Sequence, residues 1–330
     1  MTAQGVVQVV AVLMAAALLL LSPFVILGVG TPTRNVTPTV VGTRTLAQSF
    51  GQVRYAEAGV GGPTVVLLHG FNQDLGQWEG VWQLLAKSPG RKLRLDLPGF
   101  GESTVDTFDF GLAAQIERVR EFLDALQVSQ AILVGHSMGA SLAVSFAAAH
   151  PTRVTSLLLL APSGVPGALR YPGVFGVVTQ PGWGREVALS LAQTRLYRAM
   201  FPRSMALQAA SVTSSYGEAW LEQLSAVQAP TLVVWSKAEA KVMQAAPEAV
   251  VTNGSGGEVL WLDEASGHAL PRTRAELVAA LTCALAEKGP AAAVRELSGD
   301  LLRPGEGPMP NGVPNVGAAP NEQPGTNIPR

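Results

Sequence analysis

The stretch Val134-Gly135-His136-Ser137-Met138-Gly139-Ala140 decides the predicted fold of this chain. An apolar run over residues 131–134 precedes it and a run of small residues over 141–149 follows it, which predicts a strand, a sharp turn and a helix. Ser137 is expected at the tip of that turn, and the glycines on either side of it permit close backbone approach. This is the G-x-S-x-G nucleophile elbow, in which a turn presents a nucleophilic serine hydroxyl.

The length and bulk composition are those of a chain that can bury a large core, and they fit one α/β domain. The chain has 330 residues, 48% hydrophobic and 14% charged, enough to bury the core of one domain with an inserted segment. The net charge of -1 argues against a nucleic-acid partner, and we interpret the densest basic run, residues 91–94, as a solvated lead-in to a strand. The single cysteine, Cys283, excludes an intramolecular disulfide and is expected to be a small core residue. The histidines show no metal-ligand spacing, so no metal is expected.

The N-terminus has the pattern of a membrane span. Residues 5–30 contain no charged side chain and have about the length that crosses a bilayer core as a helix. We predict an uncleaved single-pass anchor, with a secretory signal peptide and a secreted protein as the competing interpretation. The first basic side chains after the span, Arg34 and Arg44, favour the cytoplasmic side for the rest of the chain.

Apolar runs and amphipathic stretches alternate along the body of the chain, as in a mostly parallel sheet. The alternation lapses at about residue 163 and resumes near residue 230, which predicts a helical insertion over the carboxyl edge of the sheet. Strands are expected at 43–47, 52–57, 64–68, 92–95, 131–134, 154–160, 231–235 and 258–262, and helices at 78–86, 112–126, 141–149 and 275–286. The expected organisation is an anchor (1–30), a linker (31–48), a core in two parts (49–162 and 226–289) around a helical cap (163–225), and a mostly disordered tail (290–330).

Four features in order carry a family resemblance. They are His69-Gly70-Phe71 after a strand, the loop Asp96-Leu97-Pro98-Gly99-Phe100-Gly101-Glu102-Ser103, the turn at Ser137, and Gly267-His268 after a late strand. From about residue 49 to 286 the chain resembles the α/β-hydrolase fold superfamily of serine esterases, lipases and haloperoxidase-like proteins. The resemblance implies a doubly wound, mostly parallel sheet with a helical cap, and a structural role for Asp96.

A serine hydroxyl needs an adjacent imidazole to take its proton, and His268 is the candidate because it follows the last strand in the chain order these enzymes use. His69, His136 and His150 are expected to be structural. The resemblance places the oxyanion hole at the backbone N–H groups of Phe71 and Met138.

The acid of the expected triad departs from the family pattern. The resemblance calls for an aspartate a few residues after the strand 231–235, and Glu239 stands there. We predict Glu239 as the residue that orients His268. Asp263 and Glu264, just ahead of His268, are the alternatives, and a site without an acid is a third.

These residues predict a serine hydrolase that cleaves an ester of a lipophilic small molecule and needs no cofactor. A serine at this turn disfavours the dehalogenase and epoxide hydrolase relatives, which use an aspartate there. A catalytically silent, membrane-tethered binding module stays open as an alternative, as do a carbon–carbon bond hydrolase and a perhydrolase. The cap residues expected to line an apolar pocket, or to bury the cap against the sheet, are Tyr171, Phe175, Trp183, Tyr197, Met200 and Phe201.

Overall fold

A computed structural model gives the fold. It describes residues 40–107, 109–164, 177–194, 196, 205–236, 258–262 and 266–288. The predicted anchor, linker residues 31–39 and the C-terminal tail lie outside these ranges, as do residues 237–257. Among the described residues, no helix is both long and apolar enough to cross a membrane.

The described residues form one sheet of eight strands in the order β1-β2-β4-β3-β5-β6-β7-β8. β2 pairs antiparallel with β1 and with β4, and the other neighbours are parallel. The strands are β1 (Thr43–Gln48), β2 (Gly51–Ala58), β3 (Thr64–Leu68), β4 (Arg91–Leu95), β5 (Ala131–His136), β6 (Val154–Leu160), β7 (Thr231–Ser236) and β8 (Glu258–Leu262). The predicted mostly parallel α/β architecture is confirmed, and the sheet begins at Thr43, inside the stretch expected to be a linker.

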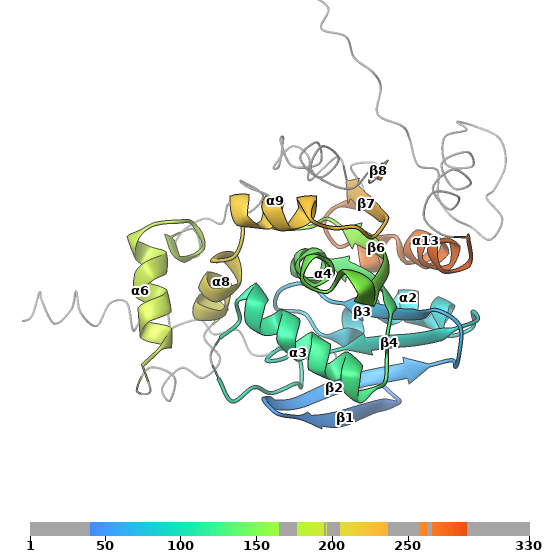
Figure 1. The fold of residues 1–330 in the computed structure, drawn as a ribbon, viewed down its shortest axis with the longest axis horizontal. Helices are drawn as coiled ribbons and strands as arrows, with labels where there is room; N and C mark the ends of the chain where they lie inside the picture. Colours follow the sequence, from blue (N-terminus) through green and yellow to red (C-terminus); the bar gives the residue numbers. More distant parts are fainter. Residues whose placement is uncertain are drawn as a thin grey trace, which may run out of the picture.

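Helices cover both faces of the sheet (Figure 1). The segments are η1 (Leu75–Trp78), α2 (Glu79–Leu85), α3 (Leu112–Ala125), α4 (Met138–Ala149), η2 (Pro151–Arg153), α6 (Trp183–Ala192), α8 (Met205–Thr213), α9 (Glu218–Ser225), α12 (Leu270–Thr273) and α13 (Ala275–Lys288). α3 packs beside α4 on one face, and α2 packs beside α13 on the other. Between β6 and β7 the chain forms α6, α8 and α9, and Figure 1 shows α9 over α4 with α6 farther from the sheet.

The central strands form the middle of the core. All six residues of β5 and all six of β7 are buried, as expected for parallel strands covered on both faces. The apolar runs in the sequence predicted this burial because a strand with helices on both sides has no face for polar side chains. The core therefore fixes the carboxyl end of β5, where Ser137 follows.

The strand expected at 92–95 is confirmed, but the expected solvation of the basic run at residues 91–94 was wrong. This run is β4 itself, and its alternation turns Lys92 and Arg94 inward, 2% and 1% exposed. Arg94 lies 2.7 Å from Glu79 and stacks on Trp82, while the Lys92 ammonium donates to the carbonyls of Ser88 and Pro89. Long side chains can be buried in this way because their aliphatic stems pack while their charged ends find partners.

Candidate active site

Ser137 occupies a sharp turn between β5 and α4. Its φ of 52° and ψ of -113° are rare for a residue with a Cβ, and the side chain is 7% exposed. The Ser137 N–H donates to the Leu160 carbonyl at 2.9 Å, and the Ser137 carbonyl accepts from Ala140 and Ser141 at 3.1 Å each. These hydrogen bonds hold the backbone in a conformation that it would not adopt alone.

The glycines on either side of Ser137 are required by close packing. A Cβ on Gly135 would lie 2.4 Å from the Gly139 carbonyl oxygen, and one on Gly139 would lie 2.1 Å from that of Leu68. Both contacts are with backbone, which cannot move aside as a flexible side chain can. The G-x-S-x-G spacing thus reflects how tightly α4 begins against β3 and β5.

The two predicted oxyanion donors lie at the same end of the sheet. Met138 is the first residue of α4, where backbone N–H groups have no partner within the helix, and Phe71 follows the end of β3. In the described part of the chain neither the Met138 nor the Phe71 N–H donates to another protein group. The Phe71 ring packs edge-on against Phe100, with ring centroids 5.8 Å apart, which fixes this residue from its side-chain end.

One pocket brings three of the predicted site residues together, namely Phe71, Ser137 and His268. It has a volume of about 230 Å³. Its lining residues are Gly70, Phe71, Gln73, Gln77, His136, Ser137, His268, Ala269 and Arg272. The elbow serine, the expected base and an expected oxyanion donor therefore share one cavity, although they come from three distant parts of the sequence.

His268 lies on a loop that is anchored on both sides of the residue. Gly267 before it has a φ of +57°, and the buried Ser266 accepts from Arg274 and Thr273, each at 2.7 Å. The His268 carbonyl accepts from the Leu270 N–H at 2.9 Å. No hydrogen bond joins Ser137 Oγ to the His268 ring in the described residues, and such contacts are often longer without substrate.

The candidate acids lie outside the described residues. The strand β7 ends at Ser236, three positions before Glu239, and β8 ends at Leu262, directly before Asp263 and Glu264. The choice among these three carboxylates therefore stays a prediction. In the described residues no group of three or more His, Cys, Asp or Glu side chains is placed to hold a metal ion.

His136 and Gln77 are two of the pocket residues to which sequence reasoning assigned no role at the site. The His136 side chain is 3% exposed, and burial, followed by the nearby His268, lowers its pKa to about 3. The ring is therefore neutral at ordinary pH. The Gln77 amide donates to His136 Nδ1 at 3.0 Å, a contact across 59 residues that no local pattern in the sequence could indicate.

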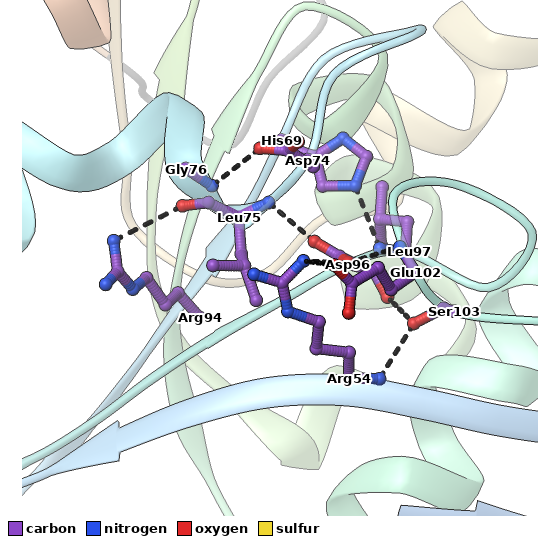
Figure 2. Close-up of polar contacts among 10 residues, drawn as sticks. All are labelled: Arg54, His69, Asp74, Leu75, Gly76, Arg94, Asp96, Leu97, Glu102 and Ser103. Carbon is purple, nitrogen blue, oxygen red and sulfur yellow. Dashed lines mark hydrogen bonds and ion pairs between the residues drawn. The ribbon is translucent and has the colours of Figure 1, made fainter. Parts of the chain in front are cut away.

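A buried polar cluster braces the turn that carries Phe71 (Figure 2). Asp96 accepts from the Leu75 N–H at 2.7 Å and from the Glu102 N–H at 2.6 Å, and its carboxylate lies 3.5 Å from the Arg54 guanidinium. Burial raises the Asp96 pKa, and these hydrogen bonds and charges oppose that rise. Asp96 therefore ties η1 and the loop after β4 to β2, in agreement with its predicted structural role.

His69 is likewise structural. Its Nδ1–H donates to the Gly70 carbonyl at 2.8 Å, and its Nε2 accepts from the Leu97 N–H at 2.9 Å. Burial lowers the pKa of its ring, so the neutral form is favoured. Both ring nitrogens are used within the protein, and His69 does not line the pocket.

The expectation for the cap aromatics fails at Trp183. This residue begins α6 and is 78% exposed, because the helix turns Gly184 and Ala188 inward instead. Trp183 therefore neither lines the pocket nor buries the cap. The other aromatic and methionine side chains expected there lie outside the described residues.

The fold and the turn at Ser137 define an α/β protein with a nucleophile elbow. A family model described as the alpha/beta hydrolase fold matches residues 63–200. The chain is 33% identical, over 239 residues, to the dihydrolipoyllysine-residue acetyltransferase component of an acetoin cleaving system from Pseudomonas putida, covering 67% of this chain and 62% of that protein. It is 30% identical, over 139 residues, to a monoacylglycerol lipase of Xenopus laevis, covering 40% of each.

Solved structures agree on the fold. A haloalkane dehalogenase from Bradyrhizobium elkani superimposes with a TM-score of 0.58 at 20% identity, covering 76% of this chain and 99% of that one. The family model and the solved structures thus agree that this chain has the α/β-hydrolase fold. The chain spans 62% or less of the length of the first curated relatives it matches.

Proposed function

We propose that this protein is a serine hydrolase that cleaves an ester of a lipophilic small molecule through an acyl-enzyme on Ser137. The observation that supports this most directly is the pocket shared by Ser137, Phe71 and His268. An aspartate would replace the serine in the dehalogenase branch of the superfamily, so the serine favours acyl transfer.

In the proposed reaction, Ser137 Oγ attacks the carbonyl carbon of the ester while His268 takes the hydroxyl proton. The Phe71 and Met138 N–H groups donate to the oxyanion that forms on the carbonyl oxygen. His268 then protonates the leaving alcohol, which departs. Water attacks the acyl-enzyme by the same route, releasing the acid and restoring Ser137.

We assign the orienting acid to Glu239, since it follows the end of β7 by three residues. Its longer side chain must still place a carboxylate against the His268 ring, and a displacement of about 1 Å can cost roughly 10²-fold in rate. Glu239→Gln should therefore lower kcat far more than Asp263→Asn does. The reverse ranking would move the assignment to the segment after β8.

A lipophilic substrate is supported by the similarity to a monoacylglycerol lipase, and we propose that residues 163–225, between β6 and β7, form a helical cap. A series of nitrophenyl esters from acetate to laurate, assayed with Ser137→Ala and His268→Ala as controls, tests both the reaction and the chain-length preference. Hydrolysis that rises with chain length and disappears in Ser137→Ala is expected. Unchanged hydrolysis in Ser137→Ala would overturn the proposal.

Wild-type protein that hydrolyses no ester but is stabilised by lipophilic ligands would indicate a binding module instead. Cleavage of a carbon–carbon bond that depends on Ser137 would indicate a carbon–carbon bond hydrolase, and peracid formation that depends on Ser137 would indicate a perhydrolase.

We also propose that residues 1–30 tether the protein to a membrane as an uncleaved helix. The support is the charge-free sequence over residues 5–30. Full-length protein should stay with the membrane fraction after alkaline extraction, whereas a chain that starts at Thr31 should not. Mature protein that naturally begins after Gly30 would show a cleaved signal peptide instead.

A further inference from the structure

Three hydrogen bonds among four residues connect the loops of the proposed active site in one continuous chain. The Gly70 N–H donates to Gln77 Oε1 at 2.9 Å, and Gln77 Nε2 donates to His136 Nδ1 at 3.0 Å. His136 Nε2 lies 2.8 Å from the His268 carbonyl oxygen. The chain runs from the turn that carries Phe71, past the elbow, to the loop that carries His268.

The direction of this chain is fixed at both ends. A carbonyl oxygen only accepts, so His136 Nε2 must carry the proton and His136 Nδ1 must be the acceptor. The Gln77 amide then has one consistent orientation, with its NH₂ toward His136 and its oxygen toward Gly70. Gln77 and His136 are 4% and 3% exposed, so reversing either would leave buried polar groups unpaired.

We propose that Gln77 and His136 are positioning residues. Through this hydrogen-bond chain they hold the His268 loop at a fixed position relative to the turn at Ser137 and the turn that carries Phe71. The proposal rests on the serine hydrolase function proposed above. His136 contacts residue 268 itself, through the carbonyl, and the two rings lie 4.8 Å apart. The same carbonyl accepts the Leu270 N–H, so His136 and the start of α12 meet at one oxygen.

Two further observations support a positioning role. His268 is an exposed residue on a loop, so the hydrogen bond to the buried His136 in β5 restricts where this loop can lie. The low pKa of His136 keeps its ring neutral, so neither its donor pattern nor its charge changes over the working range of a serine hydrolase. Gly70 fits the same arrangement, since a Cβ there would lie 2.9 Å from His136 Nδ1.

The test uses the purified full chain and four variants. His136→Phe keeps the ring shape and removes both hydrogen bonds, and Gln77→Leu removes the two links to Gly70 and His136. His136→Gln retains a donor that can reach the His268 carbonyl. Gln115→Leu is the matched control, because the buried Gln115 amide donates to the Pro98 carbonyl at 3.0 Å, and Gln115 does not line the pocket.

In ester hydrolysis we expect His136→Phe and Gln77→Leu to lower kcat by roughly 10- to 100-fold with KM within about twofold, as for a misplaced base. His136→Gln should recover most of that loss, and Gln115→Leu should keep the wild-type kcat. A kcat loss in Gln115→Leu equal to that in Gln77→Leu, or no rescue by His136→Gln, would overturn the positioning role.

Amide hydrogen exchange separates this proposal from the proposed function. The Leu270 N–H shares the His268 carbonyl with His136, so residues 266–270 should exchange faster in His136→Phe and Gln77→Leu but not in Gln115→Leu. Unchanged exchange in both variants would overturn the proposal. Faster exchange in a protein whose wild type hydrolyses no ester would uphold the structural link and refute the hydrolase function.

Discussion

Replacing Ser137 with glycine should stabilise the protein while abolishing its proposed activity. The φ of 52° and ψ of -113° at this position are unfavourable for any residue with a Cβ, at a cost of about 1–3 kcal/mol. Glycine removes that cost but gains freedom in the unfolded chain, which offsets about 0.5–1 kcal/mol. The net expectation is a gain of about 1 kcal/mol in the free energy of unfolding.

Urea unfolding of Ser137→Gly, Ser137→Ala and wild type measures this gain. Alanine keeps the Cβ, so Ser137→Ala should match the wild type within about 0.5 kcal/mol, and only the glycine variant should be more stable. On heating, a gain of this size corresponds to an increase in Tm of roughly 2–4 °C for a domain of this size. Equal stability of the glycine and alanine variants would show that the turn at Ser137 stores no backbone strain.

Three further predictions concern the surroundings of the site. Gly139→Ala should destabilise the protein by about 3 kcal/mol in urea unfolding, since its Cβ would meet the Leu68 carbonyl oxygen at 2.1 Å, whereas Gly80→Ala, whose Cβ would meet the Ala275 Cβ at 3.0 Å, should cost clearly less. Asp96→Asn should cost about 3 kcal/mol in the same assay, because an amide cannot accept both N–H groups that Asp96 accepts beside Arg54; a loss under about 1 kcal/mol would contradict this bracing role. His136 has a pKa of about 3 in the folded protein and an ordinary value of 6.5, so the unfolded chain takes up a proton on this ring first as the pH falls. The free energy of unfolding is therefore highest above pH 6.5 and falls as the pH falls toward 3. Between pH 7 and pH 4 the wild type should lose about 3 kcal/mol more than His136→Gln, and equal losses would contradict the buried neutral ring.

The features that the sequence predicted well are local ones. The turn at Ser137, the strands β5 and β7 and the position of Phe71 after β3 each follow from a short run of residues with a recognisable pattern. The placement of His268 in the same pocket depended on the resemblance to a fold family, which supplies the topology that a single run of residues does not contain.

The features that the sequence missed depend on tertiary contacts. Lys92 and Arg94 look like solvated charges in the sequence, yet α2 and the carbonyls that follow it supply partners that allow burial. The contact between Gln77 and His136 spans 59 residues and that between His136 and His268 spans 132. Such pairs become visible only when the sheet brings the loops after β3, β5 and β8 to one edge.

The central claim is that Ser137 is a nucleophile activated by His268, and covalent labelling tests it most directly. The full-length protein is treated with a fluorophosphonate and the modified peptide is located by mass spectrometry. One adduct on Ser137 is predicted, absent in Ser137→Ala and slowed by on the order of 10³-fold or more in His268→Ala. Folded wild-type protein that stays unlabelled, or a His268→Ala variant labelled as fast as the wild type, would contradict the claim.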